Sequence, residues 1–437
     1  MSPEIVGLGT ISALLLLLFL NIPVALCLIL TGLVGYILIN GVSQASFYMT
    51  GLWFASSISD YTIAVLPVFL LMGEFADTSG MMRDAFRATN IWLGNLRGGL
   101  AMASILGAAA FSAVSGSSMA CAALMARVAL PQLLEYKYDP ALATGALCAG
   151  GTLGNLVPPG ILLVFYAILV EISLGQLFIA CLLPGVLLTL MYMVQIYIQC
   201  RIDPTKGPPA ASTTWKEKLV ASKYMLGVAI VFVMVMGGIQ FGVFTPNEAA
   251  SIGTVITFIY AVIKKTVNGQ ALIQSFKNTI ITTGMICAVI IGANVFANAM
   301  AISQLPQMLA VWITDLHLSA LGLVILMMII YSFLGTALSS LTMILLTMPI
   351  FLPVLDAYDI NLVWFGVLAI VQMELANLSP PVGINLFVVA NIAKPKGISM
   401  GTVFRGSLPF CVTMLVFNIV LIIFPQISLF LVTRMGT

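Results

Sequence analysis

Two stretches of the sequence combine residue types that can hold ions inside a membrane. Residues 154–165 read GNLVPPGILLVF and residues 376–389 read ANLSPPVGINLFVV, so both contain Asn-Leu-X-Pro-Pro followed by an apolar run. Proline lacks a backbone N–H and clashes with the preceding helical turn, and a double proline therefore interrupts a helix. The N-terminus of a half-helix attracts anions, whereas freed carbonyls and the oxygens of Asn, Ser or Thr coordinate Na⁺.

Each predicted break has a companion segment rich in small polar residues. Residues 112–118 read SAVSGSS and residues 335–340 read GTALSS. The first segment lies between apolar arms of about a dozen residues, which are too short to cross a hydrocarbon layer of about 30 Å. We therefore predict two re-entrant hairpins, at about 98–130 and 319–355. The two predicted breaks lie in long spans at about 139–172 and 361–393.

The two halves of the chain repeat these features 222 residues apart, the separation of Asn155 and Asn377. At the same offset the matching pairs are Phe111 with Phe333, Ser117-Ser118 with Ser339-Ser340, Leu130-Pro131 with Leu352-Pro353, and Asn155-Leu156 with Asn377-Leu378. Proline kinks and small residues also serve helix packing alone. The paired set instead indicates a repeat that surrounds a central site.

Composition places the whole chain in a membrane. Of its 437 residues, 61% are hydrophobic and 7% are charged, with a mean hydropathy of +1.13, whereas soluble domains carry about 25% charged residues. The apolar N-terminus is expected to be a retained first span rather than a signal peptide. The net charge of +2 and the lack of basic segments interleaved with aromatic residues argue against nucleic-acid binding. The seven cysteines occur singly, which argues against a zinc site.

Lysine and arginine positions predict the orientation, because cytoplasmic loops are enriched in both. They cluster at 83–97, 127–137, 201–223, 264–277 and 394–405, which we place in the cytoplasm. Loops without Lys or Arg, which we place outside, are expected at 40–60, 172–176, 241–246, 303–318 and 356–361. The first hairpin then enters from the cytoplasm and the second from outside.

These features predict an all-α polytopic membrane protein built as an inverted repeat. The first repeat covers 1–200, a cytoplasmic linker with an amphipathic helix covers 201–224, and the second repeat covers 225–437. Besides the hairpins and broken spans, simple spans are expected at about 5–20, 24–39, 61–80, 177–200, 225–241, 246–263, 278–302 and 408–433.

Glu374 is the most conspicuous charged residue, because it lies in a predicted span three residues before the second break. A carboxylate at that depth is costly and is by default a functional candidate, although a hydrogen-bonded helix anchor is an equally good interpretation. Glu74 and Asp77 are expected nearer the cytoplasmic interface. No Lys or Arg is expected near the membrane centre, so an anionic substrate would be held by helix N-termini, hydroxyls and co-transported cations.

Several segments together closely resemble the large membrane subunit, or DctM-like subunit, of tripartite ATP-independent periplasmic (TRAP) transporters. They are SGSS, GGTLGNLVPPG, GVFTPNEAA, ILLTMPIFLP and MELANLSPPVGINLFVV, and the resemblance covers essentially the full chain. It implies a multi-pass protein of the bacterial inner membrane that works as a Na⁺-coupled, elevator-type importer. It also implies two partners, a small four-helix membrane subunit and a periplasmic binding protein. The implied substrates are C4-dicarboxylates, sialic acids or sulfonates.

Carried over to this chain, the resemblance implies a set of site residues. Those assigned to substrate binding are Ser115, Gly116, Ser117, Ser118, Pro158, Pro159, Ser340, Pro380 and Pro381. Those assigned to Na⁺, the coupling ion, are Ser115, Gly154, Asn155, Gly335, Thr336, Ser339, Asn377 and Ser379. The chain departs from common family residues at Ser339, where many relatives are acidic, at Ser379, where Thr is frequent, and at Asn155, where a branched apolar residue is common.

Other classes of function fit the sequence less well. No P-loop, HExxH or Ser-His-Asp set occurs, and an intramembrane hydrolase using Ser117 or Ser118 would have no His or Lys base at matching depth. We therefore expect no enzymatic activity and no cofactor besides Na⁺. A channel or scaffold would not require two symmetric gates. The runner-up is a stand-alone Na⁺/dicarboxylate symporter of related architecture.

Overall fold

The computed structural model describes residues 2–20, 22–59, 61–210, 213–335 and 338–434. Within these ranges every regular element is helical. Among the described residues, seven helices are long and apolar enough to cross a membrane, or eight if the bent pair α4–α5 counts as one span. The predicted class, an all-α polytopic membrane protein, is confirmed.

The first half of the chain contains ten helices of regular α geometry among its described residues. They are α1 (Pro3–Phe19), α2 (Val24–Asn40), α3 (Gln44–Ser59), α4 (Val65–Thr78), α5 (Met81–Leu93), α6 (Gly99–Ser115), α7 (Ser118–Glu135), α8 (Pro140–Leu156), α9 (Ile161–Val170) and α10 (Leu174–Ile202).

The second half begins with a bent run of helical segments. These are α11 (Trp215–Ser222), α12 (Leu226–Phe232) and α13 (Gly238–Gln240). The remaining helices are α14 (Pro246–Ile263), α15 (Gly269–Ser303), α16 (Leu305–Asp315), α17 (Ala320–Leu334), α18 (Ser340–Ala357), α19 (Leu362–Leu378), α20 (Ile384–Ala393), α21 (Met400–Ile423) and α22 (Gln426–Leu429).

Helix boundaries in the two halves keep the offset seen in the sequence. Both ends of α18 lie 222 residues after the ends of α7, and both ends of α19 lie 222 residues after those of α8. Asp139 caps α8 by accepting hydrogen bonds from the N–H groups of Ala141 and Leu142, and Asn361 caps α19 in the same way. The same cap chemistry therefore starts both of these helices.

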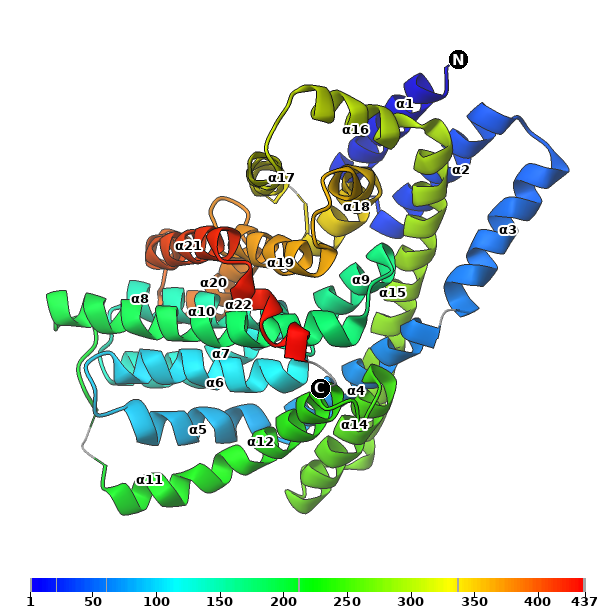
Figure 1. Ribbon diagram of the computed structural model, residues 1–437. Helices are drawn as coiled ribbons and strands as arrows, with labels where there is room; N and C mark the ends of the chain where they lie inside the picture. The colour runs from blue at the N-terminus through cyan, green and yellow to red at the C-terminus, as the bar shows by residue number, and fades with distance from the viewer. Residues whose placement is uncertain (1, 21, 60, 211–212, 336–337, 435–437) are drawn as a thin grey trace.

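Two groups of helices are visible in Figure 1. In one, α6, α7, α8 and α10 run roughly parallel at the left, with α19 and α21 above them, and α8 packs against α6, α7, α19 and α21. We call α6–α10 and α17–α21 the hairpin group. In the other, the long α15 runs diagonally and packs against α1, α2, α3 and α4. We call α1–α4 together with α14 and α15 the outer group.

Two segments expected to be loops, and one basic region assigned to the cytoplasm, contain helices. Residues 40–60 contain α3, the basic region at 83–97 contains most of α5, and residues 303–318 contain α16. The positions of Lys and Arg indicate on which side of the membrane a segment lies. They do not indicate whether its backbone is helical. The hairpin arms are also longer than a dozen residues, because α6 has 17 residues and α7 has 18. The apolar pattern of α7 continues through Pro131, and the helix ends only at Glu135.

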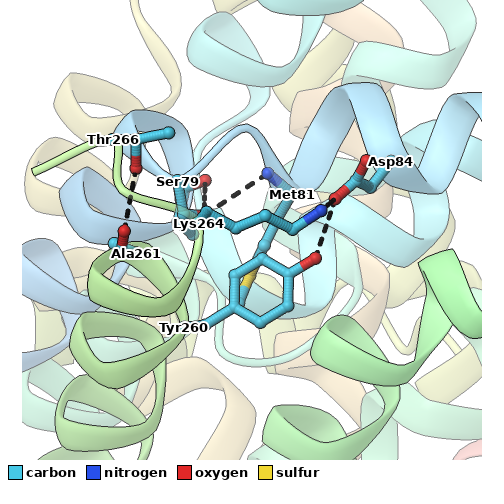
Figure 2. A network of polar contacts seen from close by, with 8 residues as sticks. Ser79, Met81, Asp84, Tyr260, Ala261, Lys264 and Thr266 are labelled. Atoms are coloured by element: carbon cyan, nitrogen blue, oxygen red, sulfur yellow. Dashed lines mark hydrogen bonds and ion pairs between the residues drawn. The ribbon is translucent and has the colours of Figure 1, made fainter.

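Helix α5 is joined to the outer group by a polar cluster (Figure 2). The Lys264 ammonium, just after α14, donates to the Asp84 carboxylate over 2.5 Å, and the Tyr260 hydroxyl donates to the same oxygen over 2.8 Å. The hydrogen bond to Asp84 raises the pKa of Lys264 above its ordinary value, so this ammonium stays charged at neutral pH. This pair fixes the end of α14 against α5.

The charge map generates a test of orientation. We expect an impermeant thiol reagent to label Leu316→Cys in intact cells and to label Lys216→Cys only after permeabilisation, since 303–318 lacks Lys and Arg whereas 201–223 is rich in them. Both positions are exposed. The control is the parent protein with Cys287 and Cys411, the partly buried native cysteines, replaced. If intact cells label Lys216→Cys and not Leu316→Cys, the orientation of the chain is opposite to the predicted one.

Candidate functional site

Both predicted breaks lie where the double prolines occur. Helix α8 ends at Leu156 and α9 begins at Ile161, while α19 ends at Leu378 and α20 begins at Ile384. The Pro158–Pro159 and Pro380–Pro381 peptide bonds are both cis. The chain thus adopts the same local backbone feature in both breaks.

The hairpin tips are formed by the small polar segments. Helix α6 ends at Ser115, Gly116 takes a left-handed conformation with φ +64°, and the Ser117 hydroxyl caps α7 by accepting from the N–H of Ala120. In the second hairpin, the Ser339 hydroxyl caps α18 by accepting from the N–H of Thr342. Thr336, a predicted Na⁺ ligand, lies outside the described residues.

The first tip packs directly on the first break. The N–H of Ile161 donates to the carbonyl of Gly116 over 2.9 Å. A Cβ on Gly116 would lie 2.2 Å from the Pro159 carbonyl oxygen, and a Cβ on Gly154 would lie 2.6 Å from the backbone of Ser117. Only glycine permits backbone contact this close. The two glycines therefore hold tip and break together.

The second tip is joined to the second break through a side chain. The Asn377 amide donates to the Ser340 hydroxyl over 2.9 Å. Gly335 packs so closely on α19 that a Cβ there would lie 2.2 Å from the Cβ of Ala376. Both hairpins thus end against a helix break.

Glu374 joins these parts in one cluster. Its carboxylate is fully buried and accepts hydrogen bonds from the Ser118 hydroxyl (2.6 Å), the Asn155 amide (2.7 Å) and the Asn377 amide (3.3 Å). Asn377 also bonds Ser340, so the network reaches the second hairpin tip. We call Glu374, Ser118, Asn155, Asn377 and Ser340 the Glu374 network. It connects both hairpin tips and both breaks through side chains alone.

Other predicted site residues lie around the network without bonding to it in the described part of the chain. The Ser379 hydroxyl donates to the carbonyl of Ala376, and the Ser339 hydroxyl bonds that of Thr342. Pro158 and Pro159 are buried, whereas Pro381 is exposed. The Ser115 hydroxyl is buried without a hydrogen-bond partner among the described residues and lines a cavity of about 300 Å³ that Ser117 also lines.

Sequence reasoning missed a second buried polar chain near the site. The Asn418 amide donates to the side-chain oxygen of Gln372, and the Gln372 amide donates to the Ser332 hydroxyl, each over 2.5 Å. Gln372 lies two residues before Glu374 on α19. A neutral amide inside an apolar run was the available signal, because a buried amide needs partners.

The network is asymmetric at its centre. The residue 222 positions before Glu374 is Thr152, whose hydroxyl donates to the carbonyl of Ala149 and bonds the Tyr192 hydroxyl over 3.3 Å. The two asparagines thus share one carboxylate, which comes from the second half. Two broken helices and two helical hairpins thus meet at a buried polar centre in an apolar helical chain, an arrangement typical of membrane transporters.

The comparisons with known proteins name the family. Residues 11–427 match the family model described as "Tripartite ATP-independent periplasmic transporter, DctM component". The chain belongs to this family. It is therefore a TRAP transporter large permease subunit and an integral protein of the inner membrane.

Relatives carry names that agree with this family. A C4-dicarboxylate TRAP transporter large permease protein from Pseudomonas aeruginosa is 35% identical, with 86% of this chain and 87% of that protein covered. A sialic acid TRAP transporter large permease protein from Vibrio cholerae is 33% identical, with 97% of each covered. An isethionate TRAP transporter permease protein from Oleidesulfovibrio alaskensis is 28% identical, with 87% of this chain and 60% of that protein covered.

Solved structures share the fold. The Alcanivorax borkumensis YdaH transporter superposes with a TM-score of 0.65 at 14% identity, covering 98% of each chain. Neisseria gonorrhoeae MtrF superposes with a TM-score of 0.57 at 16% identity, covering 86% of this chain and 83% of that one. The relatives are permeases rather than enzymes, and the family match does not favour the stand-alone symporter.

The network predicts a large effect of removing its carboxylate. Glu374→Leu leaves one buried and two partly buried donors, Ser118, Asn155 and Asn377, without this acceptor and should reduce stability by about 2–4 kcal/mol. In detergent, a thermal unfolding scan should show a clear fall in apparent Tm. The matched control is Met373→Leu, an apolar exchange of similar volume at the neighbouring buried position. An apparent Tm of Glu374→Leu equal to that of this control would show that the hydrogen bonds to Glu374 do not contribute to stability.

Proposed function

We propose that this subunit imports a small organic anion, a carboxylate or sulfonate, coupled to Na⁺ entry. The observation that carries the proposal is the Glu374 network, which joins two hairpin tips and two helix breaks at one buried place. A chain that needed only kinks would not require a fully buried carboxylate among them.

Helix N-termini support the choice of an anion. Helices α7, α9, α18 and α20 all begin at the hairpin tips and breaks, so each directs its free N–H groups toward this region. Each N-terminus carries roughly half a positive charge. The Glu374 network contains no Lys or Arg, so these backbone groups and the Ser hydroxyls would supply the contacts to the anion.

Oxygen atoms support the choice of Na⁺ as coupling ion. Asn155 and Asn377 each donate through the amide nitrogen to Glu374, which leaves the amide oxygen available to accept. Carbonyl groups at a helix break and Ser hydroxyls add further oxygen ligands. We propose one cation site near Gly154 and Asn155 and a second near Asn377 and Ser379.

Partners follow from the tripartite character of the family. We propose that a periplasmic binding protein delivers the anion and that a small four-helix membrane subunit packs on this chain. The C4-dicarboxylate, sialic acid and isethionate named for the relatives are all small organic anions. The contacts between this chain and both partners belong to the proposal.

We propose an elevator movement of the hairpin group against the outer group, within an inverted repeat. The shared 222-residue offset of α7 with α18 and of α8 with α19 supports the repeat. The hairpin group is held together by the Glu374 network, so it would move as a unit. The long α15 with α1–α4 and α14 would stay in place.

A transport assay tests the proposal. Reconstituted with its two partners in liposomes, the protein should accumulate the anion bound by the binding protein when an inward Na⁺ gradient is imposed. Uptake should require the binding protein and should not require ATP, since the chain carries no P-loop. A liposome set with K⁺ replacing Na⁺ is the control, and equal uptake in both sets would refute Na⁺ coupling.

The asparagine pair allows a finer test. Asn155→Leu and Asn377→Leu each remove one amide oxygen, so each should raise the Na⁺ concentration needed for half-maximal uptake. A loss of about 1.4 kcal/mol corresponds to about a tenfold change. Uptake is measured against Na⁺ at matched expression, with the exposed Asn391→Leu on α20 as control. An unchanged Na⁺ dependence in both variants would assign the asparagines a structural role only.

A further inference from the structure

Two cavities lie end to end along one face of α7. The inner cavity, of about 300 Å³, is lined by Ser115 and Ser117 at the first hairpin tip. The outer cavity, of about 610 Å³, is lined by three arginines, Arg83, Arg87 and Arg127. Leu124 and Arg127 line both cavities, so the two share a wall.

The residues of α7 that line the two cavities form one continuous face of the helix. Ser117, Ala120, Leu124 and Arg127 follow one another at spacings of three and four residues, which places them on one face of α7. Arg127 lies ten residues after Ser117, which corresponds to about 15 Å along the helix at about 1.5 Å per residue. The face therefore runs from the hairpin tip toward the predicted cytoplasmic side.

The three arginines form no close ion pair among the described residues, and the carboxyl on which the charges of Arg83 and Arg127 act is that of Asp77 in the inner cavity. Asp84, next to Arg83 in sequence, is bound instead by Lys264 and Tyr260 (Figure 2). Arg87 stacks on the ring of Tyr224, 4.5 Å from its centroid, which leaves its N–H donors available.

Among the described residues that line the two cavities, acidic side chains line the inner cavity and not the outer one. Glu74 and Asp77 line the inner cavity, and Glu74 accepts a hydrogen bond from the amide of Asn278 over 3.1 Å. Besides the three arginines, the outer cavity is lined by two neutral polar side chains, Asn90 and Gln132. Positive charge therefore increases from the hairpin tip outward.

We propose that the outer cavity is an anion-binding site on the path between the first hairpin tip and the cytoplasm. It would take a small carboxylate or sulfonate, whose oxygens the arginine forks bind well. Its volume lies within the range of small-molecule sites. The inference rests on the proposed import of an organic anion, and it assigns to Arg83, Arg87 and Arg127 the contacts that the Glu374 network lacks.

Reaction rates of a cysteine in the outer cavity test this site without any transported substrate. In protein lacking reactive native cysteines, Gln132→Cys is treated with an anionic and a cationic methanethiosulfonate. For Gln132→Cys, the ratio of the anionic to the cationic reaction rate should be higher than for Thr205→Cys. Thr205 is exposed and lies outside both cavities, so it serves as the reference position. Arg83→Gln or Arg127→Gln should lower the ratio about fivefold each.

Matched controls separate charge from structure. Arg127→Lys keeps the charge and should keep most of the ratio, and Arg97→Gln removes a charge outside both cavities and should change it little. Millimolar sulfate should slow the anionic reagent more than chloride at equal ionic strength. A ratio unaffected by Arg83→Gln and Arg127→Gln would overturn the inference.

Lipid and transport arms complete the test. Slowing by phosphatidylglycerol and not by sulfate would assign the cavity to a lipid headgroup and would also overturn the inference. A high reagent ratio in protein that shows no Na⁺-driven uptake would contradict the proposed function while leaving the anion site intact. Na⁺-driven uptake without a raised reagent ratio would support the proposed function and would contradict the anion site.

Discussion

A carboxylate shielded from water must receive hydrogen bonds, and this requirement organises the centre of the molecule. Glu374 is fully buried, and its two oxygens accept from Ser118, Asn155 and Asn377. An uncompensated charge at that depth would cost several kcal/mol. The hairpin tip and the two breaks that supply these donors are therefore tied to one another by the same residue. This coupling is what lets the hairpin group be treated as one unit.

The breaks impose a second constraint, since interrupted helices expose backbone groups inside an apolar region. At the first break the Gly116 carbonyl accepts from Ile161, so the tip satisfies one of the freed N–H groups. The two asparagines act at the junctions themselves and direct their amide nitrogens to Glu374. The same few residues thus provide hydrogen bonds both to the backbone freed at the breaks and to the Glu374 carboxylate. A substitution that removes one set of hydrogen bonds would therefore disturb the other set.

Sequence could predict the elements of this site because their signals are local. Paired prolines interrupt a helix wherever they occur, and a polar segment between two apolar arms indicates a hairpin tip. The bonds of Glu374 could not be predicted, because Ser118 and Asn155 lie 256 and 219 residues away from it. The helices α3 and α16 were missed because absence of charge was taken to mean a loop. Arg127 was assigned only to the cytoplasmic side, since nothing local shows that it lines a cavity.

Ser339, where the family resemblance implies an acidic residue in many relatives, has a clear structural role in this chain. Its hydroxyl caps α18 and bonds Thr342, a capping role that Asp and Ser fill about equally well. The hairpin tip therefore keeps its geometry without a carboxylate there. Within the described part of the chain, Glu374 is the one carboxyl group of the network that joins both tips. Asn155 and Asn377 donate to the same oxygen of Glu374, so this carboxyl couples the two breaks through hydrogen bonds. A ligand that draws an asparagine away from Glu374 at one break would alter the hydrogen bonding at the other.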